Sequence, residues 1–251
     1  MFHSKVTYMQ NLNKYTAGLL GLLLTGSIIS SCTKSFDEKI SLQYDFSNSA
    51  LVQVFLAVTN ASRNYVYVDA QPVNGASLAT GSVFPSTGPG FNVSGGVRNF
   101  VVRDTITGTT QVALSFAQNF QAGQRYTVFV YDTITSPKQK TVQTNIVIPS
   151  DTTCRIRFGN FVYNPNTIPA VDVFSFVRNQ NIFTNINVTD VTDFIAYPSN
   201  SPIDTLYIRP TGTTTNLFRL PTSGLTQKRS YTVVYRGSDR GTRAASLFLN
   251  Q

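Results

Sequence analysis

Short stretches in which apolar and polar residues alternate recur along most of the chain, for example at 51–60, 125–131 and 155–162. They are rich in Val, Ile, Tyr, Phe and Thr, and residues such as Gly, Pro, Asn and Ser separate them at intervals of about eight to twenty positions. Beyond residue 31, no stretch keeps apolar residues at the i, i+3, i+4, i+7 spacing of a helix over three turns. The pattern predicts an all-β chain with almost no helix outside the N-terminal segment.

The strand pattern occurs twice, at an interval of about 105 residues. The segment 125–131 (RYTVFVY) returns at 229–236 (RSYTVVYR), and 101–104 (VVRD) matches 207–210 (YIRP). Each half supplies six or seven strands, which is the number in an immunoglobulin-like sandwich. We therefore expect two tandem immunoglobulin-like β-sandwich domains, at 46–149 and 150–251.

The order of motifs in each half resembles a known family. In the first half a strand leads to the turn 60–62 (NAS), then to 65–69 (YVYVD) and 125–128 (RYTV), and this order is similar to domain-of-unknown-function family 4397, a bacterial extracellular domain. The second half is similar at 170–174 (AVDVF) and 230–234 (SYTVV), although 159–165 (GNFVYNP) replaces the family's turn. Matching 65–69 with 171–174 places Asp69 and Asp172 at equivalent strand ends, where we expect them to accept backbone hydrogen bonds. The resemblance covers about residues 50–250 and implies a fold and a compartment, but no activity.

The N-terminal segment has a different pattern. Lys5 and Lys14 lie in a polar stretch, and 16–29 (TAGLLGLLLTGSII) is an uncharged run of about fourteen residues, which suits a signal peptide and is too short to span a membrane. The following 29–32 (ISSC) resembles the lipobox of bacterial lipoproteins. That resemblance implies that residues 1–31 are a lipoprotein signal peptide and that Cys32 carries acyl chains such as palmitate, which would anchor the protein stably. Ordinary cleavage near Ser31, which would leave Cys32 as a plain thiol, is the alternative.

Residues 32–45 are expected to form the lipidated N-terminus and a flexible tether. Within them, 35–38 (SFDE) is similar to the short acidic tract that sends some lipoproteins of the Bacteroidota across the outer membrane, and ordinary solvated charge is the alternative. Thr33 is not the aspartate that retains lipoproteins at the inner membrane in enteric bacteria. We expect an outer-membrane, lipid-anchored protein exposed at the cell surface, with the periplasmic face as the alternative.

Composition removes several classes of chemistry. His3 is the only histidine and would leave with the signal peptide, so the mature chain would lack imidazole for Ser/His/Asp or Cys/His catalysis and for histidine-ligated zinc. Removing Lys5 and Lys14 lowers the net charge from +8 to +6, and the remaining basic residues are scattered, so we expect no nucleic acid partner. With Cys32 acylated, Cys154 has no disulfide partner, and its place at the start of a strand favours an apolar filler over a reactive thiol. We expect no cofactor and no metal.

Two segments between strands are the candidate binding loops. The Gly-rich 81–96 lacks the Lys-Ser/Thr of a phosphate loop and is expected to be a mobile connection, and 178–202 contains Asp190 and Asp193 without the further oxygen ligands of a calcium loop. Tyr and Phe can stack on sugar rings, although sandwich cores use the same residues. The candidate ligand contacts are Tyr65, Tyr67, Phe91 and Asn92 in the first half and Phe183, Asn185 and Asn187 in the second.

Asp-Thr followed by an aliphatic residue or Thr resembles the O-glycosylation sequon of the Bacteroidota. It occurs at four threonines, Thr105, Thr133, Thr152 and Thr205. Asp-Thr also suits turns and strand ends in a Thr-rich β-protein.

Two classes of function remain. A carboxylate-dependent glycan hydrolase needs two positioned acids, and no recognisable motif supplies them. A tandem repeat suits a binder, because duplicating a weak site raises avidity without new chemistry. We therefore expect a non-catalytic surface protein that binds a polymer or a partner protein, its partners being the membrane lipid and a glycan or another surface protein. A hydrolase, or an accessory glycan-capture lipoprotein of a polysaccharide-uptake system, is the alternative.

Overall fold

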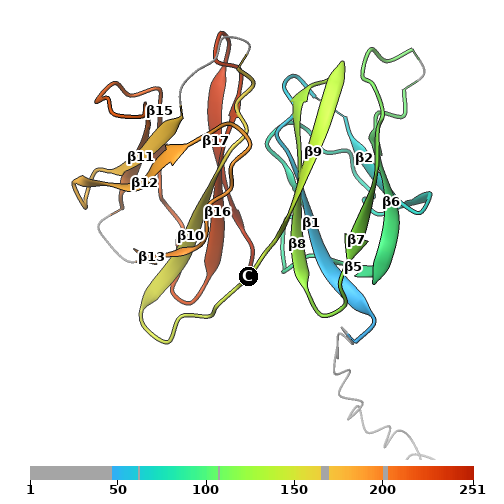
Figure 1. Ribbon diagram of the computed structural model, residues 1–251, viewed down its shortest axis with the longest axis horizontal. Helices are drawn as coiled ribbons and strands as arrows, with labels where there is room; N and C mark the ends of the chain where they lie inside the picture. Colours follow the sequence, from blue (N-terminus) through green and yellow to red (C-terminus); the bar gives the residue numbers. More distant parts are fainter. Residues whose placement is uncertain (1–46, 62, 107, 165–169, 200–202) are drawn as a thin grey trace, which may run out of the picture. The chain divides into compact units, whose positions relative to one another are not determined.

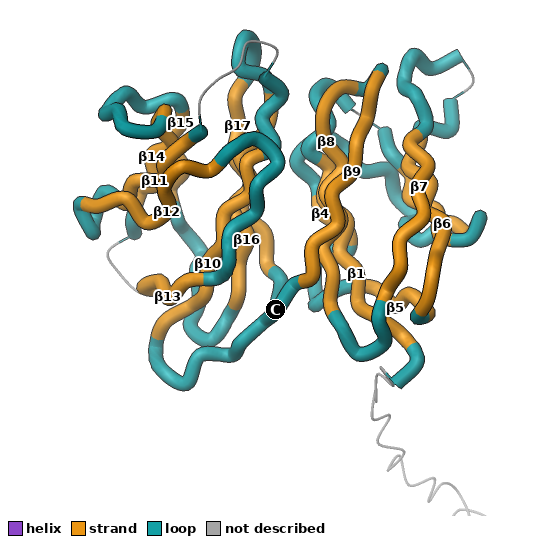
Figure 2. Tube along the Cα trace, viewed as in Figure 1, coloured by secondary structure: helices purple, strands orange, loops and turns teal. Residues whose placement is uncertain are grey.

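The computed structural model describes residues 47–61, 63–106, 108–164, 170–199 and 203–251. The predicted signal peptide, Cys32 and the tether lie outside these residues. Within them every helix or strand assigned is a β-strand, which confirms the predicted all-β fold (Figures 1 and 2). This part of the chain contains no helix with the length and apolar character needed to cross a membrane.

The first sandwich consists of two sheets built from strands between residues 49 and 143. One sheet has the order β4-β1-β8-β9, with β5 also pairing with β1, and the other has the order β3-β2-β6-β7. Their bounds are β1 (Ser49–Leu56), β2 (Tyr65–Val68), β3 (Gln71–Pro72), β4 (Val83–Phe84), β5 (Phe91–Ser94), β6 (Gly96–Arg103), β7 (Leu114–Phe120), β8 (Arg125–Thr133) and β9 (Ser136–Gln143).

The second sandwich repeats this plan between residues 153 and 249. Its sheets have the orders β13-β10-β16-β17 and β12-β11-β14-β15. The bounds are β10 (Thr153–Asn160), β11 (Val171–Ser175), β12 (Gln180–Ile186), β13 (Ile195–Pro198), β14 (Thr205–Pro210), β15 (Phe218–Pro221), β16 (Ser230–Gly237) and β17 (Arg243–Leu249).

In both sandwiches the first strand pairs in parallel with the penultimate one. β1 runs beside β8 with Gln53 opposite Thr127, and β10 runs beside β16 with Arg157 opposite Thr232. Gln53 and Arg157 therefore occupy equivalent positions in the two copies, as do the two threonines.

The pairing corrects one detail of the sequence alignment. Val66 lies opposite Val102, and Val173 lies opposite Ile208. Because 101–104 and 207–210 are the matching segments, Val66 is equivalent to Val173, and Asp69 is not equivalent to Asp172. Both carboxylates nevertheless accept backbone hydrogen bonds as expected, Asp69 from Asn99 at 3.0 Å and Asp172 from Asn185 at 2.8 Å.

The Gly-rich segment 81–96 is also different from the mobile loop that we expected. It contains β4 and β5, which both pair with β1. Gly90 has φ +139°, and a Cβ atom there would lie 2.9 Å from the backbone of Val52. Glycine at this position therefore permits close packing against β1 and does not form a phosphate cradle.

Each sandwich has its own apolar core between its two sheets. On β6 the burial alternates, because Phe100 and Val102 are buried while Asn99 and Arg103 are exposed. β1 does not alternate, since every residue after Ser49 is buried, and β10 is nearly as enclosed. A strand buried on both faces reads as a nearly continuous apolar run, so these strands must be covered on their second face as well.

The second faces of these strands cover one another. A third apolar cluster joins Phe55 and Phe129 of the first sandwich to Phe161, Val234 and Phe248 of the second. The rings of Phe129 and Phe161 stack with centroids 4.5 Å apart, and those of Phe55 and Phe248 are 5.2 Å apart. The β1–β8 sheet and the β10–β16 sheet therefore pack face to face and form a common interface.

Candidate functional site, a cleft between the two sandwiches

The interface has a polar part beside its aromatic centre. Gln53 donates from Nε2 to the carbonyl oxygen of Leu249 at 2.9 Å, and its Oε1 accepts from Asn250 Nδ2 at 2.9 Å. Both Gln53 and Asn250 are buried. A buried amide is costly without hydrogen bonds, so these contacts hold the two sandwiches in one register.

Arg157 occupies the equivalent position on the other side of this interface. Its Nε donates to Thr232 Oγ1 at 2.9 Å, and its Nη2 donates to Thr127 Oγ1 at 2.9 Å and to Thr144 Oγ1 at 3.2 Å. The residue is only 3% exposed, and its guanidinium lies 4.7 Å from the centre of the Phe194 ring. Threonines from both sandwiches thus fix the side chain in one orientation.

The charge of Arg157 has no close partner among the described residues. None of the ion pairs formed in this part of the chain involves it, and no described residue accepts a hydrogen bond from its Nη1. Burial lowers the pKa of Arg157 to about 9, and the charge of Asp193 opposes this shift. The group is therefore still cationic at neutral pH.

Arg157 opens onto a cleft of about 490 Å³. The cleft lies between the end of β9 with its following segment and, from the second sandwich, β10 with the segment 191–194. Its polar and aromatic lining consists of Gln143, Asn145, Arg155, Arg157, Asp193 and Phe194, and Val and Thr residues complete it. This volume is within the range of small-ligand sites. Neither sandwich forms the cleft alone.

The two aspartates singled out in 178–202 have separate roles. Asp190 accepts hydrogen bonds from the backbone and the side-chain amide of Asn187, at 3.1 and 3.0 Å, and so closes a local turn. Asp193 is exposed and lines the cleft. Among the residues that the structure describes, no three His, Cys, Asp or Glu side chains gather as they would around a metal ion.

The ligand contacts expected in the first half lie on different surfaces. Tyr65 and Tyr67 share the outer side of β2, since Val66 between them is buried, and the Arg103 guanidinium lies 4.8 Å from the centre of the Tyr67 ring. Phe91 packs against the core edge beside Phe84, with the rings 5.4 Å apart, while Asn92 is exposed on β5.

In the second half, Phe183 is a core residue. It is 7% exposed and stacks on Phe158 at 6.2 Å, so its ring is not available to a ligand, because a large apolar side chain at this position contributes more by filling the core. Asn185 and Asn187 are exposed, and the backbone of Asn185 is bound to Asp172. None of the seven expected contacts lines the inter-sandwich cleft.

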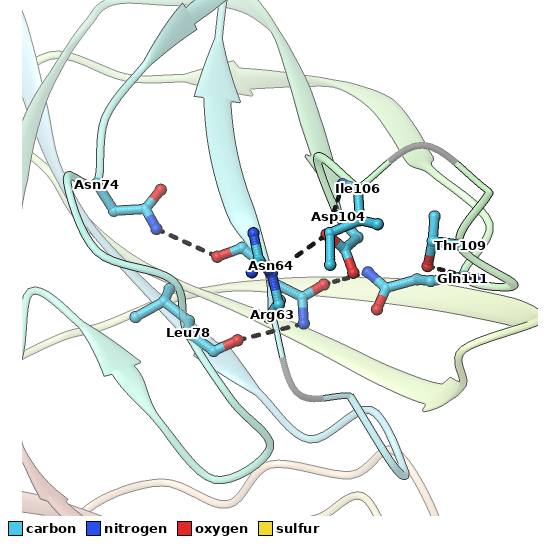
Figure 3. Close-up of polar contacts among 8 residues, drawn as sticks. All are labelled: Arg63, Asn64, Asn74, Leu78, Asp104, Ile106, Thr109 and Gln111. Carbon is cyan, nitrogen blue, oxygen red and sulfur yellow. Dashed lines mark hydrogen bonds and ion pairs between the residues drawn. The ribbon is translucent and has the colours of Figure 1, made fainter.

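A second polar cluster lies at the end of the first sandwich, beside the 60–62 turn (Figure 3). Asn74 Nδ2 donates to the carbonyl oxygen of Asn64 at 3.2 Å, Asn64 Nδ2 donates to that of Leu78 at 3.3 Å, and Gln111 Nε2 donates to Asn64 Oδ1. Asn64 and Asn74 are buried and use their amides to join three segments of the chain. The cluster stabilises this end of the sandwich and leaves no cavity for a ligand.

Asp204 is the centre of a third cluster, in the second sandwich. Its Oδ2 accepts from Ser175 Oγ and Tyr197 OH, and its Oδ1 accepts from the amides of Val177 and Thr205. Burial alone would raise the pKa of Asp204, but these hydrogen bonds outweigh it and lower that pKa. The carboxylate is therefore held ionised, which suits a structural role and not that of a general acid.

The Asp-Thr threonines differ in exposure. Thr105 and Thr152 are exposed, whereas Thr133 and Thr205 are half-buried at strand ends. Asp104 and Asp151 each accept the amide hydrogen of the residue two positions later, at 2.9 Å, which is the turn geometry that Asp favours. Cys154 is fully buried, donates to the carbonyl oxygen of Tyr197, and has its pKa raised by burial to about 11. It is the apolar filler that the sequence predicted.

The sequence reasoning did not single out Arg155, Arg157 or Phe194. The available signal was two arginines at i and i+2 in a strand that is otherwise apolar (154–158, CRIRF), which places both on one face. The chain matches no protein-family model, and a search of curated proteins finds no match for it. The site must therefore be interpreted from its own geometry.

Proposed function

We propose that this is a non-catalytic binding protein of the bacterial cell envelope, anchored in the outer membrane through Cys32, which captures a polymer or a partner protein at the cleft between its sandwiches. The observation that carries the proposal is the cleft itself, where a buried and oriented cation meets polar side chains from both copies. Such a cleft offers directed polar contacts on a rigid frame, as binding sites require.

The lining supports binding over hydrolysis. Glycoside hydrolysis uses a pair of carboxyl groups on either side of the scissile bond, and Asp193 is the one carboxylate among the residues that line the cleft. The other strongly held carboxylate, Asp204, gives both oxygens to protein donors. A ligand in the cleft thus meets groups that hold it and one acid.

The test is capture of immobilised polymers on a glycan array by the full chain, purified in detergent. Asn145→Trp fills the cleft from an exposed position, and Asn92→Trp makes the same change at an exposed position on β5 of the first sandwich. We expect Asn145→Trp to abolish capture and Asn92→Trp to retain it. The reverse result would move the site to the first sandwich, and turnover of a captured glycan would make the protein an enzyme.

The anchor is tested separately. Labelling of cells with an alkyne fatty acid should mark the wild type and fail on Cys32→Ala, and equal labelling of both would refute lipidation. Intact mass of the protein from its native host tests the Asp-Thr sites, because a mass explained by sequence and lipid alone excludes glycan at Thr105, Thr133, Thr152 and Thr205.

A further inference from the structure

Several features of the cleft concern one charge. Arg157 and Arg155 both line it, and Asp193 is the only acid that does, so the lining carries one net positive charge. Arg155 uses Nη1 to contact Thr153 Oγ1 at 2.7 Å and has no described acid as an ion-pair partner. The cleft is therefore complementary to a ligand with a single negative charge at each bound unit.

The buried position of Arg157 strengthens this argument. A cation removed from water is costly unless an anion compensates it, and three hydroxyl acceptors supply hydrogen bonds without negative charge. These bonds leave Nη1 available on a residue that lines the cleft. An arginine oriented in advance loses little entropy when it pairs with a carboxylate, and it forms a charge-assisted hydrogen bond.

The remaining polar groups indicate what carries the carboxylate. Asp193 accepts hydrogen bonds only and repels a second negative charge, while the amides of Gln143 and Asn145 both donate and accept. Hydroxyl groups next to the carboxylate would satisfy all three. A sugar acid carries its carboxylate and hydroxyls on one rigid ring, whereas an acidic peptide carries the carboxylate on a flexible side chain that must be ordered at a cost.

We infer that the cleft recognises a uronic acid unit of a polysaccharide, with its carboxylate paired to Arg157 and Arg155 and its hydroxyls bonded to Asp193, Gln143 and Asn145. This inference rests on the proposed function and specifies the ligand class for the same cleft.

The test measures binding of trigalacturonate to the full chain in detergent by titration calorimetry. The comparison ligands are the fully methyl-esterified trisaccharide, which keeps the hydroxyls and loses the charge, and triglutamate, which keeps carboxylates without the ring. We expect the ester and triglutamate each to bind at least about tenfold more weakly than trigalacturonate, and the affinity for trigalacturonate to fall with added salt.

Three variants locate the contact. Arg157→Gln places at this position the residue that the first sandwich has at its equivalent, Gln53, so we expect it to fold, and Arg155→Gln changes a less buried group. Both should weaken trigalacturonate binding at least about tenfold. Arg219→Gln removes the same charge from an exposed site on β15 and should bind as the wild type does.

The outcomes separate the two proposals. If the ester binds as tightly as the acid and Asn145→Trp abolishes both, the cleft is a binding site and the uronic acid assignment is wrong. If triglutamate alone binds, the carboxylate belongs to a peptide and the sugar assignment is wrong. Wild-type affinity in both arginine variants would also overturn the inference, whereas capture of no polymer at all on the array would refute the proposed function.

Discussion

The aromatic contact between the sandwiches makes a quantitative prediction for Phe129→Ala. Phe129 is on β8, is fully buried, and stacks on Phe161 of the second sandwich at 4.5 Å. Its side chain belongs to the face of the sheet that would be exposed if the two sandwiches moved independently. The substitution therefore measures whether the interface exists in solution.

The expected magnitude follows from burial and ring contact. Truncating a buried phenylalanine to alanine costs about 3–5 kcal/mol, and part of this is the loss of an aromatic pair worth about 0.5–1.5 kcal/mol. For a chain of this size about 2–4 °C in melting temperature corresponds to each kcal/mol, so we expect a decrease of about 10 °C. Phe176→Ala is the matched control, because Phe176 is 63% exposed, and should cost about 0.5 kcal/mol or less.

Urea unfolding followed by far-ultraviolet circular dichroism and tyrosine fluorescence gives both free energies, since the chain has 12 Tyr and no Trp. The wild type should unfold in one transition by both probes, because the interface couples the two sandwiches. A loss below about 1 kcal/mol for Phe129→Ala, close to that of Phe176→Ala, would show that the two sheets do not pack against each other and would remove the basis of the cleft.

Three further predictions concern single positions in the second sandwich. Asp204→Asn should cost about 1–3 kcal/mol at pH 7, because it replaces an acceptor of four hydrogen bonds; since the folded pKa lies below the unfolded value of about 3.9, the wild type should lose this advantage as the pH falls below about 4, and a pH-independent difference in urea titrations would contradict the assignment. Native Cys154 should react with iodoacetamide at pH 8 at least about tenfold more slowly than in urea, as measured on its own peptide, because burial raises its pKa to about 11. Gly237→Ala should cost about 1–3 kcal/mol by thermal melting, since its φ is +93° and a Cβ would lie 2.1 Å from a carbonyl oxygen, and it should cost more than Gly212→Ala, which has a similar φ but open space.

Sequence pattern was sufficient for the fold class because most strands carry their own signal. Segments such as 125–131 combine β-branched and aromatic residues with flanking turn residues, and the structure has strands there. β4 and β5 carry no such signal, since they have two and four residues in a Gly-rich segment and are formed by pairing with β1. Replacing 81–96 with a flexible linker would therefore remove two edge pairings of β1, and we now expect it to lower the melting temperature.

The candidate site could not be predicted in the same way, because it depends on packing between the copies. Alternation in a sequence indicates which side of a strand faces a core, but it does not show whether the other side meets water or a second sheet. Phe183 illustrates the first part of this problem, since an aromatic residue in a strand has the same pattern in a core as on a binding face. Arg157 illustrates the second, since its burial results from threonines on both sandwiches.

The equivalence of Gln53 and Arg157 explains how a duplicated sandwich can acquire a site that one copy lacks. Gln53 contacts Asn250 after the last strand of the second sandwich, and Arg157 contacts Thr144 after the last strand of the first, so the interface has the reciprocal contacts of a two-fold dimer within one chain. In an exact dimer both positions would have to carry the same residue, and a charge that suits one side would be buried on the other as well. Because the two copies are covalently joined and differ in sequence, the neutral amide stabilises one side while the cation is placed on the side where the cleft opens. Arg157→Gln makes the two sides alike at this position, and for this reason it should preserve the interface while removing the charge that we assign to ligand recognition.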